Sequence, residues 1–336
     1  MNCSLMAAPP PVPGARPYVT VVQYNCLAEG LSGDDAGFDS LPKDEMAWPK
    51  RGYELTREII DADADVVCLQ EVDHYHDTFR PALHAQGYDG IYREDEWSPC
   101  LKTTDGKLAD GVAIFYKREK LELLGMHVPF TPRDVKEPPI EERRDAGKCL
   151  VARFRLRGPI DERRGPGWKD YTCAKQDFIV ASLHLASAKN EDGVKRRESQ
   201  ALCAMKEILT FKAMSGAGRE DRLAPIIVAG DLNAQPHEPA VEVFKKLGLM
   251  SCYLRHIRAE PLFTTWKIRS GPYKPGEAKM TIDYIFAQHS AFDVYDVLAM
   301  PRSDELGPKG LPCRGHPSDH LMLKASLEFV VPVGDP

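Results

Sequence analysis

The stretch Pro225–Pro236, PIIVAGDLNAQP, contains an apolar run that ends abruptly in polar residues. The β-prone run 226–229, closed by Gly230, predicts a buried strand that stops at a tight turn. Asp231 and Asn233 then lie two positions apart, so an extended backbone directs both side chains to the same side. A buried acid or amide is costly unless a partner binds it. The stretch therefore indicates either an ordinary turn or a binding site at a strand end.

The composition is that of a globular protein with scattered thiols. Of 336 residues, 43% are hydrophobic and 28% are charged, which is typical of folded domains. A net charge of -6 argues against broad nonspecific binding of nucleic acid, although a local basic cleft is compatible with it. Nine cysteines occur without a Cys-x-x-Cys pair, which favours reduced thiols and a cytoplasmic location over a disulfide framework or a zinc site. No apolar run is long enough to span a membrane.

The two ends of the chain differ from its middle. Residues 1–18 are rich in proline and are expected to form a disordered lead-in. Only Arg16 is basic there, so mitochondrial targeting is the weaker alternative to a cytoplasmic location. Residues 19–330 are expected to form one folded domain, and residues 331–336 a short tail.

The hydrophobic periodicity predicts many strands and few helices. Strands are expected over 19–25, 66–69, 112–116, 121–126, 149–156, 178–185, 226–229, 281–286, 294–300 and 320–329, and helices over 50–62, 78–85, 194–213 and 239–247. In the long helix, Leu202, Met205 and Leu209 share one apolar face. This order of elements predicts an α/β four-layer sandwich, in which two mainly antiparallel or mixed β-sheets pack face to face with helices on both outer faces.

Several of these strands end in polar residues, as the strand before Asp231 does. The set comprises Asn25, Glu71, His184, Asp319 and His320, and Asp283 lies within the expected strand 281–286. Each of them alone is compatible with a solvated turn or a packed core position. Asp283 is flanked by apolar Ile282 and Tyr284, however, and a buried carboxylate needs a partner such as a histidine or a metal ion. The recurrence of the pattern indicates one polar site.

These residue types suit metal-dependent hydrolysis of phosphoesters. Mg²⁺ prefers oxygen ligands and is held by one or two carboxylates, and Glu71 is the best candidate for the first ligand. An aspartate can position and deprotonate an attacking water, while His320 oriented by Asp283 can stabilise the charged transition state. The amides of Asn25 and Asn233 can donate to phosphate oxygens. No Gly-x-Ser-x-Gly, Walker loop or His-Glu-x-x-His motif occurs, which disfavours those enzyme classes.

In order along the chain, Asn25 and the motifs LQE, HL, GDLN, IDY and SDH resemble the series that characterises the endonuclease/exonuclease/phosphatase superfamily. The resemblance extends from about Val19 to Phe329. Within the superfamily, the segments CLQEVDHYHDTFRPAL, DGVAIFY, TTWKIRS and HPSDHL are similar to the nocturnin-like proteins of the deadenylase-like branch. This resemblance implies that 19–330 is a catalytic domain with Mg²⁺ as cofactor and Mn²⁺ as an alternative. It implies as substrate either NADP(H), cleaved at its 2'-phosphate, or single-stranded poly(A) RNA, degraded from its 3' end.

The resemblance also implies a role for each residue of the series. Around the metal, it implies Glu71 as the carboxylate ligand, with Asn25 beside it on the phosphate and Asp319 nearby. For catalysis, it implies Asp231 and Asn233 to align the attacking water and the transition state, His184 to contact the phosphate, and His320 as the catalytic histidine with Asp283 as its orienting partner. For the substrate, it implies that Arg269, in TWKIRS, contacts a phosphate.

The chain departs from the nocturnin-like pattern in two segments. Those proteins read HLKAR, with a lysine and an arginine that contact the NADP phosphates, where this chain reads HLASAK, so Ala186 replaces the lysine and the arginine position falls near Ala188. Lys189 is expected to compensate if the segment carries an insertion. In the second segment, Asp95 stands where a basic residue is expected shortly before WSPC, with Arg93 two residues earlier. These departures leave the catalytic centre complete and weaken the assignment of NADP(H) as substrate.

Three functions remain open, led by an NADP(H) 2'-phosphatase. A 3'-exoribonuclease acting on poly(A) needs a basic and aromatic groove, which the basic loops 133–148 and 155–169 could supply although acids intersperse both. An inactive scaffold that binds adenine nucleotides or partner proteins is disfavoured, because all the expected catalytic positions are filled.

Overall fold

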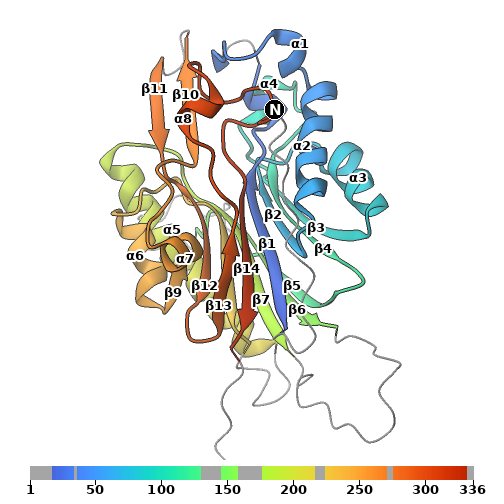
Figure 1. Cartoon of the computed structure of the whole chain (residues 1–336), viewed down its shortest axis with the longest axis vertical. Coiled ribbons are helices and arrows are strands. Elements are labelled where there is room, and N and C mark those ends of the chain that lie inside the picture. The colour runs from blue at the N-terminus through green and yellow to red at the C-terminus, as the bar shows by residue number, and fades with distance from the viewer. Residues whose placement is uncertain are drawn as a thin grey trace, which may run out of the picture.

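The structure, a computed structural model, describes residues 17–33, 36–129, 145–157, 176–215, 224–270 and 275–330. Two six-stranded sheets pack face to face with helices outside them (Figure 1), so the expected four-layer α/β sandwich is confirmed. The expected lead-in and tail lie outside the described residues, except for Pro17 and Tyr18, where the first strand begins.

Each sheet takes strands from distant parts of the chain. The first contains, in spatial order, β13 (Phe292–Val297), β14 (Leu323–Phe329), β1 (Tyr18–Asn25), β2 (Val66–Gln70), β4 (Gly111–Lys117) and β3 (Tyr88–Glu94). The second contains β5 (Leu121–His127), β6 (Lys148–Leu156), β7 (Asp177–His184), β8 (Ile226–Asp231), β12 (Asp283–Gln288) and β9 (Leu249–Ser251). A separate hairpin of β10 (Thr265–Arg269) and β11 (Gly276–Met280) stands at the upper end of Figure 1.

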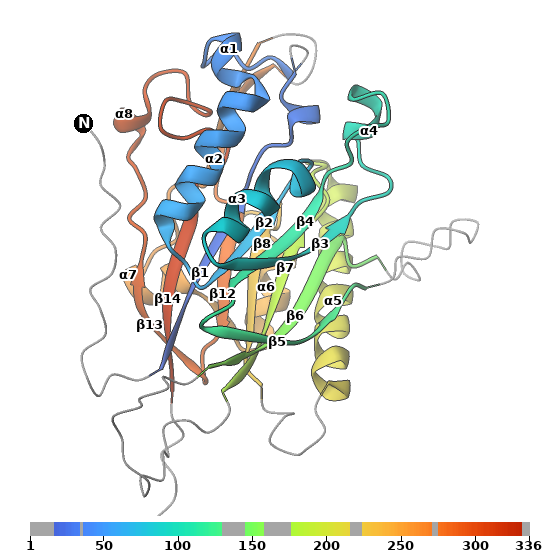
Figure 2. The same cartoon turned by 90° about the vertical axis from the view of Figure 1, so that its right-hand side faces the viewer.

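Helices cover the outer face of each sheet. On the first sheet lie α2 (Trp48–Ala62) and α3 (Arg80–Ala85), the latter preceded by a π-helical turn (Tyr75–Phe79), and on the second lie α5 (Glu191–Met214) and α6 (Pro239–Lys246). The view in Figure 2 brings α2 and α3 to the front. The shorter helices are η1 (Glu29–Leu31), α1 (Lys43–Met46), α4 (Cys100–Thr103), α7 (Cys252–Ile257) and α8 (Ser303–Leu306). Among the described residues, no helix combines the length and apolar character needed to cross a membrane.

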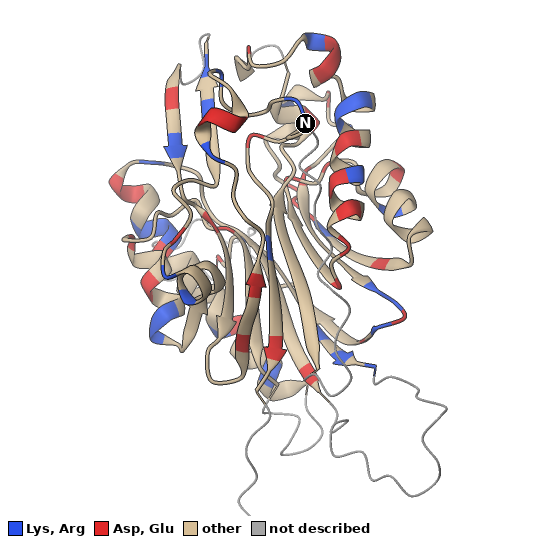
Figure 3. Cartoon of the chain, viewed as in Figure 1, with Lys and Arg blue, Asp and Glu red and all other residues tan. Residues whose placement is uncertain are grey.

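The strand sequences explain the layering. In β1, Val21 faces the second sheet while Val22 faces α2, because successive side chains point to opposite sides of a strand. Both are fully buried, so the strand is an unbroken apolar run and not an alternating one. Figure 3 shows the charged residues mainly on helices and strand ends. A polar side chain within the sandwich is therefore an exception that needs a partner.

Two strands begin later than their sequences suggest. Strand β12 begins at Asp283 and β14 at Leu323, so the expected strands 281–286 and 320–329 started too early. The reason is that the residues before β14 pair with the hairpin: His320 forms a bridge with Thr265, and Leu321 N donates to the Thr264 carbonyl at 2.7 Å. Asp283 therefore lies at the mouth of a strand and not inside one.

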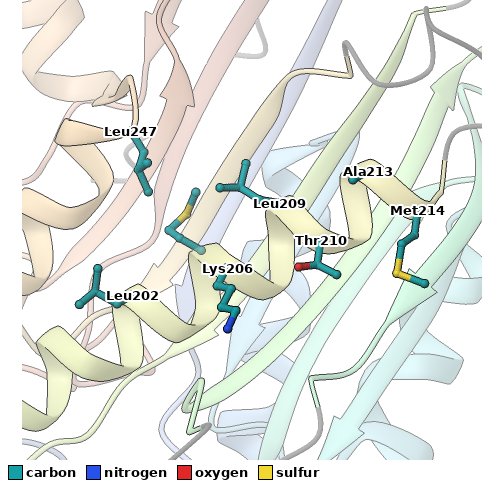
Figure 4. A pocket seen from close by; sticks show the side chains of 8 residues that line it. Leu202, Lys206, Leu209, Thr210, Ala213, Met214 and Leu247 are labelled. Atoms are coloured by element: carbon teal, nitrogen blue, oxygen red, sulfur yellow. The ribbon is translucent and has the colours of Figure 1, made fainter. Parts of the chain in front are cut away.

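The apolar face expected on the long helix is only partly buried. Met205 is 2% exposed, whereas Leu202 is 55% and Leu209 is 42% exposed. The two leucines line a surface groove of about 510 Å³ together with Met214 and with Leu247, which follows α6 (Figure 4). The core under α5 instead uses the small residues Ala201 and Ala204 beside Met205 and Ile208, which allow the helix to approach the sheet closely.

Candidate active site

The pairing of the strands brings the polar strand ends of both sheets together. In the first sheet, β1 and β2 are parallel and Asn25 lies level with Gln70, so Glu71 follows directly beside it. In the second, β7 and β8 are parallel and His184 lies level with Asp231, while antiparallel β12 places Asp283 opposite Asp231. Residues that are more than 200 positions apart in the sequence therefore meet at one end of the sandwich.

Asn25 joins the two sheets at this end. Its Nδ2 donates to Glu71 Oε1 at 2.9 Å and to Asp231 Oδ2 at 3.0 Å, and its Oδ1 accepts from Leu27 N at 3.0 Å. Both amide hydrogens are thus used within the protein. In this structure Asn25 positions two carboxylates, and its expected contact with a phosphate stays a prediction.

Glu71, His184 and Asp231 form a cluster that fits a divalent metal ion. Their ligand atoms all lie within 4.8 Å of one another. His184 Nε2 is 3.9 Å from Glu71 Oε1 and 3.7 Å from Asp231 Oδ2. Two carboxylates and an imidazole are suitable donors for a small divalent cation. Glu71 has a left-handed backbone with φ of 54°, a conformation that is rare for non-glycine residues and concentrates at functional sites.

Asp283 and His320 form the expected pair. His320 Nδ1 is 2.9 Å from Asp283 Oδ2, and both side chains are buried. Asp283 also accepts from Thr264 Oγ1 at 2.6 Å and from Gln23 Nε2 at 3.0 Å. Burial alone lowers the pKa of His320, but the charge of Asp283 raises it to about 9, so the imidazole is protonated at neutral pH. Burial in turn raises the pKa of Asp283.

A buried polar chain below the site connects this pair to the second sheet. Gln23 Nε2 also donates to Gln70 Oε1 at 2.7 Å, and Gln70 Nε2 donates to Ser182 Oγ at 3.2 Å. All three side chains are buried, so each needs these partners. The two glutamines lie in apolar strands, QYN and CLQ, and no sequence pattern marks them as parts of the site.

Asp319 is paired with protein cations. Its Oδ2 lies 2.7 Å from Lys267 Nζ and 3.5 Å from Arg269 Nη2. Burial opposes the charge of Asp319, but Lys267 and His320 hold the pKa of its carboxyl well below the usual range. Burial likewise lowers the pKa of Lys267, and Asp319 more than offsets this, so both groups stay charged. The groups of described residues that could hold a metal do not include Asp319.

Sequence reasoning missed Lys267, although a signal was present. It lies two positions before Arg269 in β10, and residues two apart on a strand share a face. The expected substrate contact of Arg269 therefore implied that Lys267 also faces the site. Arg269 itself lies over the Phe38 ring, 4.4 Å from its centroid, and borders the site from the hairpin.

Asp231 and Asn233 form a tight turn after β8. Asp231 Oδ1 accepts from Asn233 N at 2.8 Å, and Asn233 has φ of 51°. Burial opposes the charge of Asp231, but His320, His184 and Lys267 together hold its pKa below the usual value, so it is a carboxylate at neutral pH. Asn233 Nδ2 donates to the Leu185 carbonyl at 3.1 Å, which uses one of its two amide hydrogens, and the expected donation to phosphate stays a prediction.

Lys189 reaches the site, as the sequence suggested, while Arg93 does not. Lys189 Nζ donates to Asn233 Oδ1 at 3.1 Å and to the Asn233 carbonyl at 3.2 Å. Arg93 Nη1 instead donates to the carbonyls of Gly147 and Cys149 at 3.0 and 3.1 Å. The ammonium of Lys189 therefore lies beside the catalytic turn in a chain that lacks a lysine at Ala186.

Buried side chains fix the loop that carries Lys189. Arg197 Nη1 donates to the carbonyls of Ala186 and Ala188, and Gln200 Oε1 accepts from Ala186 N at 2.9 Å. Asn190 then caps α5 by accepting from Gly193 N at 3.0 Å. Asp95, at the second departure from the pattern, lies 3.5 Å from Lys148 Nζ, so a cation from β6 accompanies it.

Comparison with known proteins agrees with this geometry. Residues 22–320 match the Endonuclease/Exonuclease/phosphatase family, and the chain belongs to this family. It is 30% identical to human Nocturnin over 94% of this chain and 67% of that protein. The solved human Nocturnin catalytic domain with a bound sulfate anion matches with a TM-score of 0.66 and 26% identity, covering 94% of each chain. A structure of ANGEL2, a 2',3'-cyclic phosphatase, matches with a TM-score of 0.69 over 94% of this chain and 97% of that chain, and at 22% identity it supports the fold alone.

The chain is thus a metal-dependent phosphoesterase or nuclease of this superfamily. Its site combines two carboxylates and a histidine that fit a metal ion with a second histidine that a buried aspartate orients.

Proposed function

We propose that this protein is a Mg²⁺-dependent phosphohydrolase that removes the 2'-phosphate of NADP(H). The observation that carries the choice of substrate is the position of Lys189. The nocturnin-like proteins place a lysine at the position of Ala186, and here the Lys189 ammonium lies 3.1 Å from Asn233 Oδ1 in the same loop. Lys189, three positions after Ala186, then supplies the cation that is expected to bind an NADP phosphate.

We assign separate roles in the reaction to the residues of the site. Glu71, His184 and Asp231 would hold the metal, which would supply positive charge to the phosphate and lower the pKa of a nearby water. Asp231, charged at neutral pH, orients the attacking water and accepts its proton. His320, protonated and held by Asp283, donates to a phosphate oxygen as charge develops on it. Asn25 and Asn233 fix the carboxylates and the turn that carry out these steps.

A substrate comparison tests the proposal. The purified protein with Mg²⁺ is offered NADP⁺, NADPH and oligo(A) side by side, and release of phosphate or of AMP is measured. We expect release of phosphate from NADP(H). If the protein instead degrades oligo(A) and leaves NADP(H) intact, it is an exoribonuclease. The basic loops considered for RNA lie largely outside the described residues, and the described Arg155 Nε pairs with Asp177 at 2.7 Å.

Variants of the lysine sharpen the test. Loss of a charge-assisted bond to phosphate costs about 1.5–3 kcal/mol, so Lys189→Met is expected to lower kcat/KM for NADP(H) by roughly 10- to 150-fold. Ala186→Lys in the Lys189→Met background restores part of that loss, because it returns a cation to the same loop. Lys195→Met, on the exposed face of α5, is the matched control and leaves the kinetics unchanged. Equal kinetics for Lys189→Met and the control exclude Lys189 as a substrate contact.

We also propose a cytoplasmic location. The seven described cysteines form no disulfide, which is compatible with a reducing compartment. Fractionation of cells that express the full chain tests this location, and recovery with mitochondria contradicts it.

A further inference from the structure

Two neutral donors hold the carboxylate of Asp283 in addition to His320. Gln23 Nε2 donates to its Oδ1 at 3.0 Å, and Thr264 Oγ1 donates to its Oδ2 at 2.6 Å. His320 Nδ1 lies 3.1 and 2.9 Å from the same two oxygens. We propose that Gln23 is a positioning residue, which holds the carboxylate of Asp283 in the orientation that accepts from His320. The inference rests on the proposed phosphohydrolase function, in which His320 donates to the phosphate.

A chain of hydrogen bonds that ends on the backbone fixes the direction of the Gln23 amide. Ser182 Oγ donates to the Leu69 carbonyl at 3.4 Å, so its lone pairs accept from Gln70 Nε2 at 3.2 Å. The side-chain oxygen of Gln70 therefore faces Gln23, whose Nε2 donates to it at 2.7 Å. The second hydrogen of the same Nε2 is left for Asp283. A flipped Gln23 amide would place oxygen against oxygen at both contacts.

Gln23 interrupts an apolar face of β1, and its donated bonds account for this exception. Val19 and Val21 share its face of the strand and pack between the two sheets. The side chain of Gln23 is fully buried, and its Oε1 has no hydrogen-bond partner within the part of the chain that the structure describes. A buried acceptor without a partner destabilises a fold, whereas an apolar side chain of similar size avoids this cost.

The two neutral donors leave the carboxylate of Asp283 little freedom to rotate. Rotation would break the bond from Gln23 and the bond from Thr264 together. The imidazole then keeps Nδ1 on Asp283, and its Nε2 lies 3.8 Å from Asp231 Oδ2, the carboxylate that we assign to the attacking water. Small displacements of a catalytic group lower the rate strongly, so a donor that fixes Asp283 supports catalysis without touching the substrate.

Gln23 could instead serve only to fill the space between the sheets, and two variants separate the roles. Gln23→Met keeps the length of the side chain but removes both donated bonds. Thr20→Val is the matched control, because Thr20 is a buried residue of the same strand whose Oγ1 donates to the buried carboxylate of Asp65 at 2.8 Å, at the end of β1 remote from Asn25. Each change is made in the wild type and in the His320→Ala background. Stability, kcat and KM are measured for the folded full chain.

Proton NMR observes the bond that Gln23 is proposed to position. The Nδ1–H of a histidine that donates to a carboxylate gives a resonance far downfield, because the hydrogen bond is charge-assisted. Histidine labelled with ¹⁵N identifies this resonance, and its absence from His320→Ala assigns it to His320. The measurement needs no substrate.

We expect Gln23→Met to lower kcat roughly tenfold, to keep KM within about twofold and to shift the His320 resonance. In the His320→Ala background, the same change lowers the remaining rate by less than about twofold. Thr20→Val lowers stability but keeps the wild-type kcat and resonance. The inference is overturned if Gln23→Met keeps the wild-type kcat, if it leaves the resonance in place, or if it lowers the rate equally in both backgrounds, as a packing role requires. Should Gln23→Met fail to fold, Gln23→Leu replaces it in the same comparison.

The outcomes also distinguish this inference from the proposed function. A wild type that releases phosphate from NADP(H), with a Gln23→Met variant that has the same kcat and resonance, refutes the role of Gln23 alone. A wild type that hydrolyses no phosphoester, with a His320 resonance that shifts in Gln23→Met, refutes the proposed function and supports Gln23 as the residue that positions Asp283 and His320.

Discussion

The two sides of the site balance their negative charge differently. On the hairpin side, each carboxylate contacts a protein cation: Asp283 is 2.9 Å from His320, and Asp319 is 2.7 Å from Lys267. On the other side, Glu71 and Asp231 share the neutral amide of Asn25, and the imidazoles that pair with them are 3.7–3.9 Å away. Carboxylates that lack a close protein cation indicate where a metal ion supplies the charge. We call the first the hairpin side, where protein cations balance the carboxylates, and the second the metal side, where Glu71 and Asp231 contact no protein cation as closely.

The largest expected effect tests whether Glu71 is a metal ligand. Glu71→Gln keeps the side-chain volume but removes the charge, so we expect a loss of at least about 3 kcal/mol in transition-state stabilisation with little change in fold. Excess Mg²⁺ or Mn²⁺ is expected to restore part of the activity. Hydrolysis measured at limiting and saturating metal checks this, with Glu94→Gln at the exposed end of β3 as control. Near-normal turnover at limiting metal shows that Glu71 is not a ligand.

On the hairpin side, we expect Asp283 and His320 to act as one unit. We expect His320→Ala to lower kcat roughly 10²–10³-fold, and Asp283→Asn to add less than about threefold once the histidine is gone. The reason is that Asp283 contacts His320 directly and contributes to catalysis by orienting it. Single and double variants compared under saturating substrate provide the measurement. Losses that simply multiply in the double variant mean that the two residues act independently.

The smallest expected effect is on the pH dependence of stability, and it arises from His320 on the hairpin side. The folded pKa of His320, about 9, lies above the unfolded value near 6.5, so its stabilising contribution is complete below pH 6.5 and disappears as the pH rises through 9. For metal-free protein, we expect the free energy of unfolding to fall by up to about 1.4 kcal/mol per pH unit in this window. Urea unfolding of the wild type and of His320→Gln measures it. Parallel pH profiles for the two proteins contradict the expected protonation.

The sequence predicted the polar site residues at the strand ends, but it did not predict the buried side chains that form hydrogen bonds with them. Asp231 and Asn233 stand out because an apolar run stops at them, and the fold requires that such ends meet. Gln23 carries no such signal, since its partner Asp283 is 260 positions away and only the pairing of both sheets brings them together. For the same reason, sequence reasoning did not predict that the two hydrogen bonds of Asn25 connect carboxylates from separate sheets.

Local periodicity also failed where a helix face remains exposed. Leu202 and Leu209 follow the helical repeat as closely as Met205 does, yet only Met205 packs against the second sheet. Periodicity identifies the direction of an apolar face but not its width, which depends on how close the helix approaches the sheet.

The pairing of β1 with β14 has a consequence for how the chain is made. The first strand leaves the ribosome about 300 residues before the strand that completes its hydrogen bonding. At about 5–20 residues per second, β1 waits on the order of 15–60 s for this partner. Until then one of its edges lacks the partner that it has in the finished sheet, and His320, three residues before β14, has not yet been synthesised. A nascent chain interrupted before residue 320 is therefore both inactive and exposed to aggregation through that edge.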